Sequence, residues 1–265
     1  RARQAALKRR AEMNQHRVKE LKDTPKSVSE NKYDIAHLGF ESQIINLFLL
    51  ARDFFQNGKF DIAMQAMQRY RALVDYNELL QIKGDRCQKG DIDISVVIVT
   101  HNRNRDLKKC LDSLHQSKAN CIYEVLVVDN GLSDVNIFKK DIDLYIKCPI
   151  NFNLTEGRNI GAHFARGKIL AFLDDDALVG SNYLLSIKMA FDKLDIFGLR
   201  GRAYPKNNPD ANKGVSIYNL GDSPFPSYCN QEGNSAFRRD IYLQMGGMDP
   251  LLFGHEGSDL TYRII

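Results

Sequence analysis

Apolar positions divide the chain into two regions with different periodicities. Up to about residue 90, apolar side chains recur near every 3.6 positions with few β-branched clusters, which indicates helices. From residue 92 onward, short β-branched runs alternate with helical patterns. We therefore expect a helical N-terminal region at residues 1–90, with a basic helix and a helical hairpin, and an α/β domain at residues 91–265.

The hairpin is predicted from two apolar helix faces separated by a turn at residues 56–58. The positions that form these faces are Leu47, Leu50, Ala51 and Phe54 on the first helix, and Ala63, Met67 and Tyr70 on the second. Their offsets resemble a single tetratricopeptide repeat, and a plain helical hairpin explains them equally well. Because such a unit cannot bury its own apolar face, it must pack on the next domain, on more helices or on another subunit.

The second region predicts an open, mostly parallel sheet with helices on both faces. Apolar, β-branched runs at residues 94–99, 123–128, 143–147 and 168–173 have the pattern of buried parallel strands. Helical patterns at residues 105–116 and 156–166 alternate with them. Ligands of such sheets bind beyond the carboxyl ends of the strands.

Three polar turns follow these strands, at residues 100–103, 129–131 and 174–176. If the strands are parallel, the turns converge on one crevice. Asn102 and Arg103 of the first turn are then available to a nucleotide. Asp129, at the end of the second strand, can accept hydrogen bonds from a nucleobase or a ribose.

The third turn contains three consecutive carboxylates, Asp174, Asp175 and Asp176. Adjacent carboxylates repel one another, so a bound cation is the natural compensation. A hard ion such as Mn²⁺ or Mg²⁺ takes one or two carboxylates and completes its shell with phosphate oxygens and water, which suits a diphosphate leaving group. The alternative is an Asp-rich cap on a helix that opens at Ala177.

Composition narrows the class of protein. The 43% of hydrophobic and 26% of charged residues exclude wholesale disorder and fibrous repeats. The formal charge is +4, and nine of the 37 Lys and Arg residues lie in the first 26 positions. We interpret this stretch as a solvated helix; the alternative is contact with an anionic membrane surface or a nucleic acid. Five cysteines without a Cys-x-x-Cys pair suit a reducing cytoplasm.

Six blocks carry a more specific resemblance. They comprise residues 94–103, Val127-Val-Asp-Asn-Gly131, Gly157-Arg-Asn-Ile-Gly161 with Ala165-Arg-Gly167, Phe172-Leu-Asp-Asp-Asp176, Asn234-Ser-Ala-Phe-Arg-Arg239 with Gly246-Gly-Met-Asp249, and His255-Glu-Gly-Ser-Asp-Leu260. In this order they resemble family 2 of the inverting glycosyltransferases, which have the GT-A fold. The resemblance covers about residues 92–265.

The resemblance implies roles for individual positions. It places a nucleoside, usually that of a uridine diphosphate sugar, on Thr100, Asn102 and Asp129. Asp174 and Asp176 match an Asp-x-Asp pair at the ribose, the sugar and the metal. We assign the whole donor site to Thr100, Asn102, Arg103, Asp129, Arg158, Asp174 and Asp175, and the metal to Asp174 and Asp176. Arg158 matches a block that borders the nucleotide, and a salt bridge at the start of a helix explains it equally well.

The far end departs from the family pattern. Family members usually have Glu-Asp where this chain has Glu256-Gly257, and that Asp is commonly the base that deprotonates the acceptor hydroxyl. The role passes to Glu256, which we prefer, or to Asp259, which alternatively braces the helix that starts there. The chain stops at Ile265 within an expected helix, so the domain is expected to be truncated.

Together with the resemblance, these observations predict a metal-dependent enzyme that transfers a sugar from a nucleoside diphosphate sugar, usually a UDP sugar, to a glycan hydroxyl with inversion. The resemblance implies a setting in bacterial surface polysaccharide synthesis. No nucleic acid partner is expected. We expect a cytoplasmic location, in which residues 1–90 are either free or contact the inner face of the membrane or a partner protein. Two alternatives are a nucleotidyltransferase, which the absence of glycine from residues 100–103 argues against, and a non-catalytic nucleotide-sugar-binding module of a larger polymerase.

Overall fold

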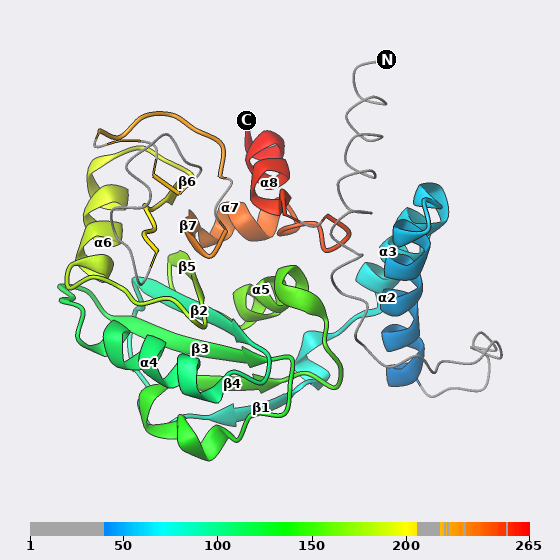
Figure 1. Ribbon diagram of the computed structural model, residues 1–265, viewed down its shortest axis with the longest axis horizontal. Helices are drawn as coiled ribbons and strands as arrows, with labels where there is room; N and C mark the ends of the chain where they lie inside the picture. Colours follow the sequence, from blue (N-terminus) through cyan, green and yellow to red (C-terminus); the bar gives the residue numbers. More distant parts are fainter. Residues whose placement is uncertain (1–39, 206–217, 220, 222, 230–231, 253) are drawn as a thin grey trace. The chain divides into compact units, whose positions relative to one another are not determined.

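The computed structural model describes residues 40–265 except 206–217, 220, 222, 230–231 and 253 (Figure 1). The basic stretch at residues 1–26, with its predicted helix and membrane contact, lies outside the described residues. The chain divides into two compact units, Arg1–Val74 and Asp75–Ile265. None of the helices in the described ranges is long and apolar enough to span a bilayer.

The described part of the first unit is a pair of helices, α2 (Phe40–Gln56) and α3 (Phe60–Leu73). Ile44, Phe48 and Ala51 are buried on α2, and Ala63, Met67 and Tyr70, the predicted face, are buried on α3. The helical hairpin is therefore present, whereas its resemblance to a tetratricopeptide repeat is not confirmed.

The division between the units lies earlier than the boundary predicted at residues 89–91. After η2 (Tyr76–Glu78), residues 80–83 form strand β1 (Leu80–Lys83), which pairs antiparallel with β4 at the edge of the sheet. Three of its four side chains are exposed, so β1 lacks the apolar alternation by which strands are recognised. Outside the short helix η2, the expectation that residues 75–90 are helical is therefore wrong.

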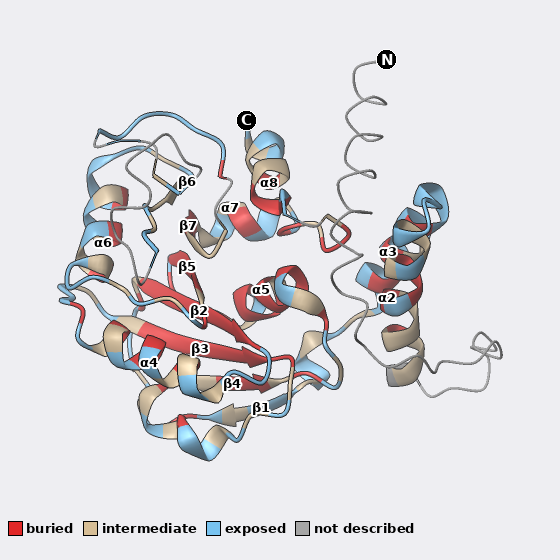
Figure 2. Ribbon diagram, viewed as in Figure 1, coloured by how far each residue is buried: buried red, intermediate tan, exposed pale blue. Residues whose placement is uncertain are grey.

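The second unit contains a seven-stranded sheet of order β1-β4-β3-β2-β5-β7-β6. Its central strands β4, β3, β2 and β5 are parallel, as predicted, and β1, β7 and β6 join them antiparallel. The remaining bounds are β2 (Ile94–Thr100), β3 (Tyr123–Asp129), β4 (Leu144–Lys147), β5 (Ile169–Asp174), β6 (Gly198–Arg200) and β7 (Asn234–Arg238). β2 is buried along its whole length (Figure 2).

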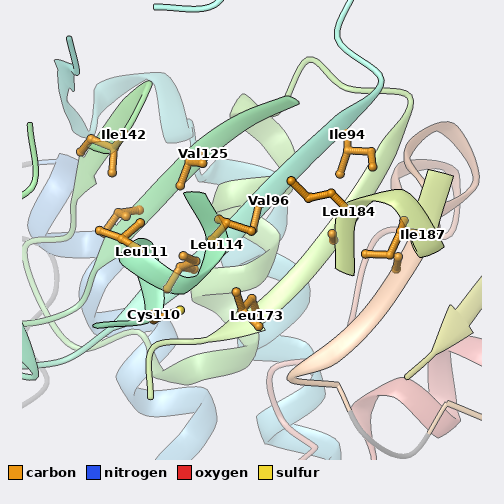
Figure 3. Packing of buried hydrophobic residues seen from close by; sticks show 14 of the residues in the cluster. Ile94, Val96, Cys110, Leu111, Leu114, Val125, Ile142, Leu173, Leu184 and Ile187 are labelled. Carbon is orange, nitrogen blue, oxygen red and sulfur yellow. The ribbon is translucent and has the colours of Figure 1, made fainter. Parts of the chain in front are cut away.

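Helices cover both faces of the sheet. On one face, α4 (Asn104–His115) packs Leu111 and Leu114 near Val96 and Val125, and α6 (Tyr183–Lys193) adds Leu184 (Figure 3). On the other face lies α5 (Asn153–Phe164), which contacts β2 and β3. Short helices η3 (Val135–Ile137), η4 (Lys139–Asp141) and α7 (Arg239–Gln244) precede the last helix, α8 (Glu256–Ile264). The unit is an α/β domain with the GT-A fold.

Candidate active site at the carboxyl edge of the sheet

The register of the parallel strands brings the three polar turns to one edge of the sheet. Thr100 of β2 pairs with Asp129 of β3, and Val99 pairs with Asp174 of β5. Asp129 in turn pairs with Lys147 of β4. The ends of all four parallel strands are therefore level, and the turns that follow them are neighbours, as the strand order predicted.

The three aspartates of the third turn have different surroundings. Asp175 is buried and accepts a 2.7 Å hydrogen bond from Oγ1 of Thr100, which is buried as well. The side chains of Asp174 and Asp176 are 44% and 53% exposed. No helix opens at Ala177, since the next helix, α6, begins at Tyr183, so the proposed helix cap is wrong. The turn presents two carboxylates and anchors itself through the third.

Two arginines face the exposed carboxylates. Arg158, buried on α5, places Nη2 3.0 Å from Oδ1 of Asp174. Arg103, which is exposed, places Nη1 2.5 Å from Oδ2 of Asp176 and 3.6 Å from Oδ1 of Asp175. Both predictions for Arg158 are compatible with this contact, because its salt bridge ends on the turn predicted to border the nucleotide.

Burial and neighbouring charges act in opposite directions on the carboxylate in the middle of the turn. Burial raises the pKa of Asp175 above its ordinary value, and the hydrogen bond from Thr100 and the charge of Arg103 lower it in part. The hydrogen bond from Arg103 to Asp176, followed by the charges of Asp175 and Asp176, raises the pKa of Arg103. The guanidinium therefore stays charged beside the turn.

Asp129 is fully buried, and donors within the protein surround its carboxylate. Oδ1 accepts from the backbone N–H of Gly131 at 2.8 Å, and Oδ2 accepts from Ser133 N–H at 3.1 Å. The Tyr145 hydroxyl and the Lys147 ammonium donate to Oδ2 at 2.6 and 2.5 Å. This carboxylate therefore fixes the turn after β3, and its direct contact with a nucleoside stays a prediction.

Asn102 links the first turn to the second. Its backbone is in the left-handed region, with φ of 60°, which Asn tolerates better than most residues. Its side-chain oxygen accepts a 2.8 Å hydrogen bond from the backbone N–H of Leu132. Asn102 and its neighbour His101 are both exposed, so the edge offers polar side chains to solvent on an ordered pair of turns.

The two carboxylates predicted as alternative bases lie on α8. Glu256 is its first residue; the carboxylate is buried and accepts a 2.8 Å hydrogen bond from Oγ1 of Thr155 on α5. Asp259 lies in the same helical turn, and its Oδ2 is 3.0 Å from Nε of Arg263. That pair is the bracing contact considered for Asp259 from the sequence.

Other residues at this edge were missed by the sequence analysis. Tyr145 and Lys147 lie on a predicted strand, and a parallel register with β3 would have placed Lys147 beside Asp129. Glu232 and Gly233 directly precede β7 and lie outside the six sequence blocks. Gly233 lies so close to Asp174 that a Cβ atom at residue 233 would overlap the Asp174 carboxylate.

The same turn is the candidate site for a metal ion. No group of three or more His, Cys, Asp or Glu residues in the described ranges is arranged to hold a metal ion. Asp174 and Asp176 nevertheless supply accessible carboxylate oxygens, the donor type that hard divalent cations prefer. The residues fit a cation that takes its other ligands from a phosphate group and water, and they do not form a complete cage.

Comparisons with known proteins agree on one family. The model of glycosyl transferase family 2 matches residues 95–245. Validoxylamine A glucosyltransferase of Streptomyces hygroscopicus subsp. limoneus is 34% identical over 105 residues, which are 37% of this chain and 23% of that protein. Poly(ribitol-phosphate) beta-glucosyltransferase of Bacillus spizizenii is 26% identical over 189 residues, 57% of this chain and 30% of that protein. The matches thus span less than a third of these relatives.

Solved structures of other proteins share the fold. S. aureus TarS superposes with a TM-score of 0.53 at 16% identity, over 65% of this chain and 33% of that one. TarS 1-349 in complex with UDP gives a TM-score of 0.50 at 16% identity, over 65% of this chain and 55% of that one. The mannosyltransferase PcManGT from Pyrobaculum calidifontis, with GDP-Man and Mn²⁺, gives 0.50 at 15% identity, over 85% and 61%.

Proposed function

The chain belongs to glycosyl transferase family 2, and we propose that it transfers a sugar from a uridine diphosphate sugar to a hydroxyl group of a glycan, with inversion at the anomeric carbon. The two relatives described above are named as glucosyltransferases, one of them a poly(ribitol-phosphate) beta-glucosyltransferase. A glucosyl donor and a bacterial surface polymer as acceptor are therefore the first to test.

The turn at Asp174, Asp175 and Asp176 is the observation that carries the proposal. It lies level with the ends of β2 and β3, its middle residue is tied to Thr100, and its outer carboxylates are exposed. A diphosphate bound at this edge meets two guanidinium groups, on Arg103 and Arg158, whose planar donors suit phosphate oxygens.

Asp174 and Asp176 are the residues that would hold Mn²⁺ or Mg²⁺ together with the donor. A bound divalent ion would supply positive charge to the phosphate oxygens on which negative charge develops. PcManGT contains Mn²⁺ together with its nucleotide sugar, which supports a metal in this chain. Arg158 and Arg103 pair with these two carboxylates.

The nucleoside is proposed to lie over the first two turns. Asn102 exposes its side chain there and is held by Leu132. Thr100 and Asp129 lie beneath, and their side chains bond within the protein. We therefore propose that Thr100, Asp129 and Asp175 position the turns, and that Asn102, Arg103, Arg158, Asp174 and Asp176 contact the donor or its metal.

Two measurements test this function. Thermal unfolding of the chain with Mn²⁺ and a panel of nucleotide sugars should show stabilisation by UDP-glucose or another UDP sugar. Release of UDP from that sugar should stop on addition of a chelator and should fall by roughly 100-fold or more in Asp176→Ala. The matched control is Asp195→Asn, which changes an exposed carboxylate near the start of β6, at the end of the sheet opposite to the carboxyl ends of the parallel strands. Undiminished turnover in chelator would exclude the metal.

A further inference from the structure

The proposed transfer needs a group that accepts a proton. As the acceptor oxygen forms its bond to the anomeric carbon, the bond from that carbon to the diphosphate oxygen breaks, and its electron pair leaves with UDP. The proton of the acceptor hydroxyl must pass to a base within hydrogen-bond reach. A carboxylate on the acceptor side of the Asp174 turn is the expected group.

The carboxylates predicted for this task are already engaged. Glu256 is 7% exposed and accepts a hydrogen bond from Thr155, which is itself 1% exposed. Asp259 is paired with Arg263 one turn along α8. Asp174 and Asp176 face arginines and the proposed diphosphate.

Glu232 is placed differently. Its Oε1 accepts a 2.9 Å hydrogen bond from the backbone N–H of Gly257, in the first turn of the nine-residue helix α8, where the helix dipole favours a negative charge. The side chain is half-buried. No described residue donates a hydrogen bond to Oε2.

The carboxylate of Glu232 fills the space that a side chain at residue 257 would take. A Cβ atom added to Gly257 would lie 2.9 Å from Oε1 and 3.0 Å from Cγ of Glu232, and 2.8 Å from the carbonyl oxygen of Cys229. Because residue 257 is glycine, the carboxylate of Glu232 has room at this point. A carboxylate reaches the start of α8 from the segment before β7 instead of from α8 itself.

The chain also brings Glu232 close to the proposed diphosphate site. The next residue, Gly233, abuts the Asp174 carboxylate, and its carbonyl oxygen accepts a 3.2 Å hydrogen bond from the backbone N–H of Asp174. Consecutive Cα atoms are about 3.8 Å apart. Glu232 is thus the chain neighbour of a residue that contacts the Asp174 turn, where the leaving group is proposed to bind.

We propose that Glu232 is the catalytic base, which takes the acceptor proton on Oε2 while Gly257 holds Oε1. This inference rests on the proposed function. Once UDP has left, Glu232 returns the proton to water, so no further reactant is consumed. Glu256 then acts as a positioning residue, which holds the start of α8 to Thr155.

The test is UDP release from UDP-glucose with Mn²⁺, with water as the acceptor. Glu232→Gln keeps the hydrogen bond to Gly257 and loses the base. We expect kcat to fall by about 100-fold or more and KM for UDP-glucose to stay within about twofold. Glu232→Asp, which retains a carboxylate, should recover part of kcat. Glu256→Gln should reduce kcat less than Glu232→Gln does.

Controls separate this inference from the proposed function. UDP affinity and thermal unfolding of each variant show whether the fold and the donor site survive; if Glu232→Gln unfolds, the comparison of Glu232→Asp with Glu256→Gln decides. If the wild-type chain releases UDP and Glu232→Gln releases it at the same rate, the role of Glu232 is overturned and the proposed function stands. Equal kcat values for Glu232→Asp and Glu232→Gln would also overturn the role of Glu232 alone. A wild-type chain that neither binds UDP nor turns over any nucleotide sugar would overturn both proposals.

Discussion

Two carboxylates at the carboxyl edge of the sheet are buried and form hydrogen bonds within the protein. Asp129 and Asp175 were predicted to contact the donor; their side chains bond to Tyr145, Lys147 and Thr100 inside the protein, and direct contact with a donor stays a prediction. The sequence pattern identified them because polar residues at strand ends are unusual. It could not separate a side chain that touches a ligand from one that shapes the turn, since that depends on the direction of each side chain.

The same limit explains Glu232. Residue type alone gives nine-residue α8 two acidic candidates in its first turn, Glu256 and Asp259. A third carboxylate reaches that turn from residue 232, and the contact joins positions 25 residues apart. No periodicity encodes such a contact, so the sequence directed attention to the helix itself.

Asp175 leads to a prediction at this scale about the pH dependence of stability. Burial raises its pKa in the folded protein above the ordinary value of 3.8. The folded state then binds more protons than the unfolded state just above that value, so this residue's contribution to stability is present at lower pH and is lost as pH rises through the folded pKa. Asp175→Asn removes the titration, and its free energy of unfolding should fall less between about pH 4 and pH 7.

Urea unfolding at several pH values measures this effect. Asp192→Asn, which changes an exposed carboxylate paired with Lys188 on α6, is the matched control and should follow the wild-type curve. If Asp175→Asn also follows the wild-type curve in shape, Asp175 does not titrate as a buried group. The variant should also keep UDP affinity within about threefold if Asp175 only anchors the turn, because Asn can accept the hydrogen bond from Thr100.

At the scale of elements, burial decides which strands the sequence could reveal. β2, β3 and β5 are buried on both faces and therefore appear as continuous apolar runs. The three antiparallel strands were missed. β1 is exposed and β6 has only three residues. In β7, the polar residues Asn234 and Arg238 at the two ends leave a short buried centre with little apolar pattern.

Helix α5 owes its position on the sheet to glycine, which leads to a second prediction. A Cβ atom at Gly161 would overlap Cγ1 of Val97 in the buried strand β2 and lie 3.3 Å from Cγ2 of Val128. Gly161→Ala should therefore destabilise the protein by about 1–3 kcal/mol, although alanine favours helices more than glycine by about 1 kcal/mol. Because α5 also carries Arg158 and Thr155, UDP release should fall as well.

Chemical denaturation compares this variant with Gly180→Ala, whose added Cβ atom meets nothing within 4 Å. The control should stay within about 0.5 kcal/mol of wild type. Equal stabilities for the two variants would mean that α5 can move away from β2 at little cost, and that Gly161 does not position the site.

For the whole molecule, the division into two units places all of the proposed chemistry in one of them. The units are Arg1–Val74 and Asp75–Ile265, and the residues proposed to contact the donor lie between residues 102 and 176. The apolar pattern predicted a helical region followed by an α/β domain, and the described residues 40–73 contain the helices α2 and α3. It placed the boundary too late, because an exposed edge strand and a short helix leave little periodicity between residues 75 and 90.

This organisation leads to a prediction about where a ligand protects the chain. Binding of UDP with Mn²⁺ at about 100 times its dissociation constant stabilises the state that binds it by about 2.7 kcal/mol. Hydrogen exchange measured by peptide mass spectrometry should slow in segments that contain residues 100–103, 129–133 and 174–176, because the nucleotide restricts their opening. Peptides from α2 and α3 should exchange at the same rate with and without ligand.

A chelator tests the part played by the metal. UDP in chelator should protect the first two segments more than the third, since Asp174 and Asp176 are the residues proposed to hold the metal. Protection that appears on α2 and α3, or that leaves the three turns unchanged, would contradict a donor site built from the carboxyl edge of the sheet.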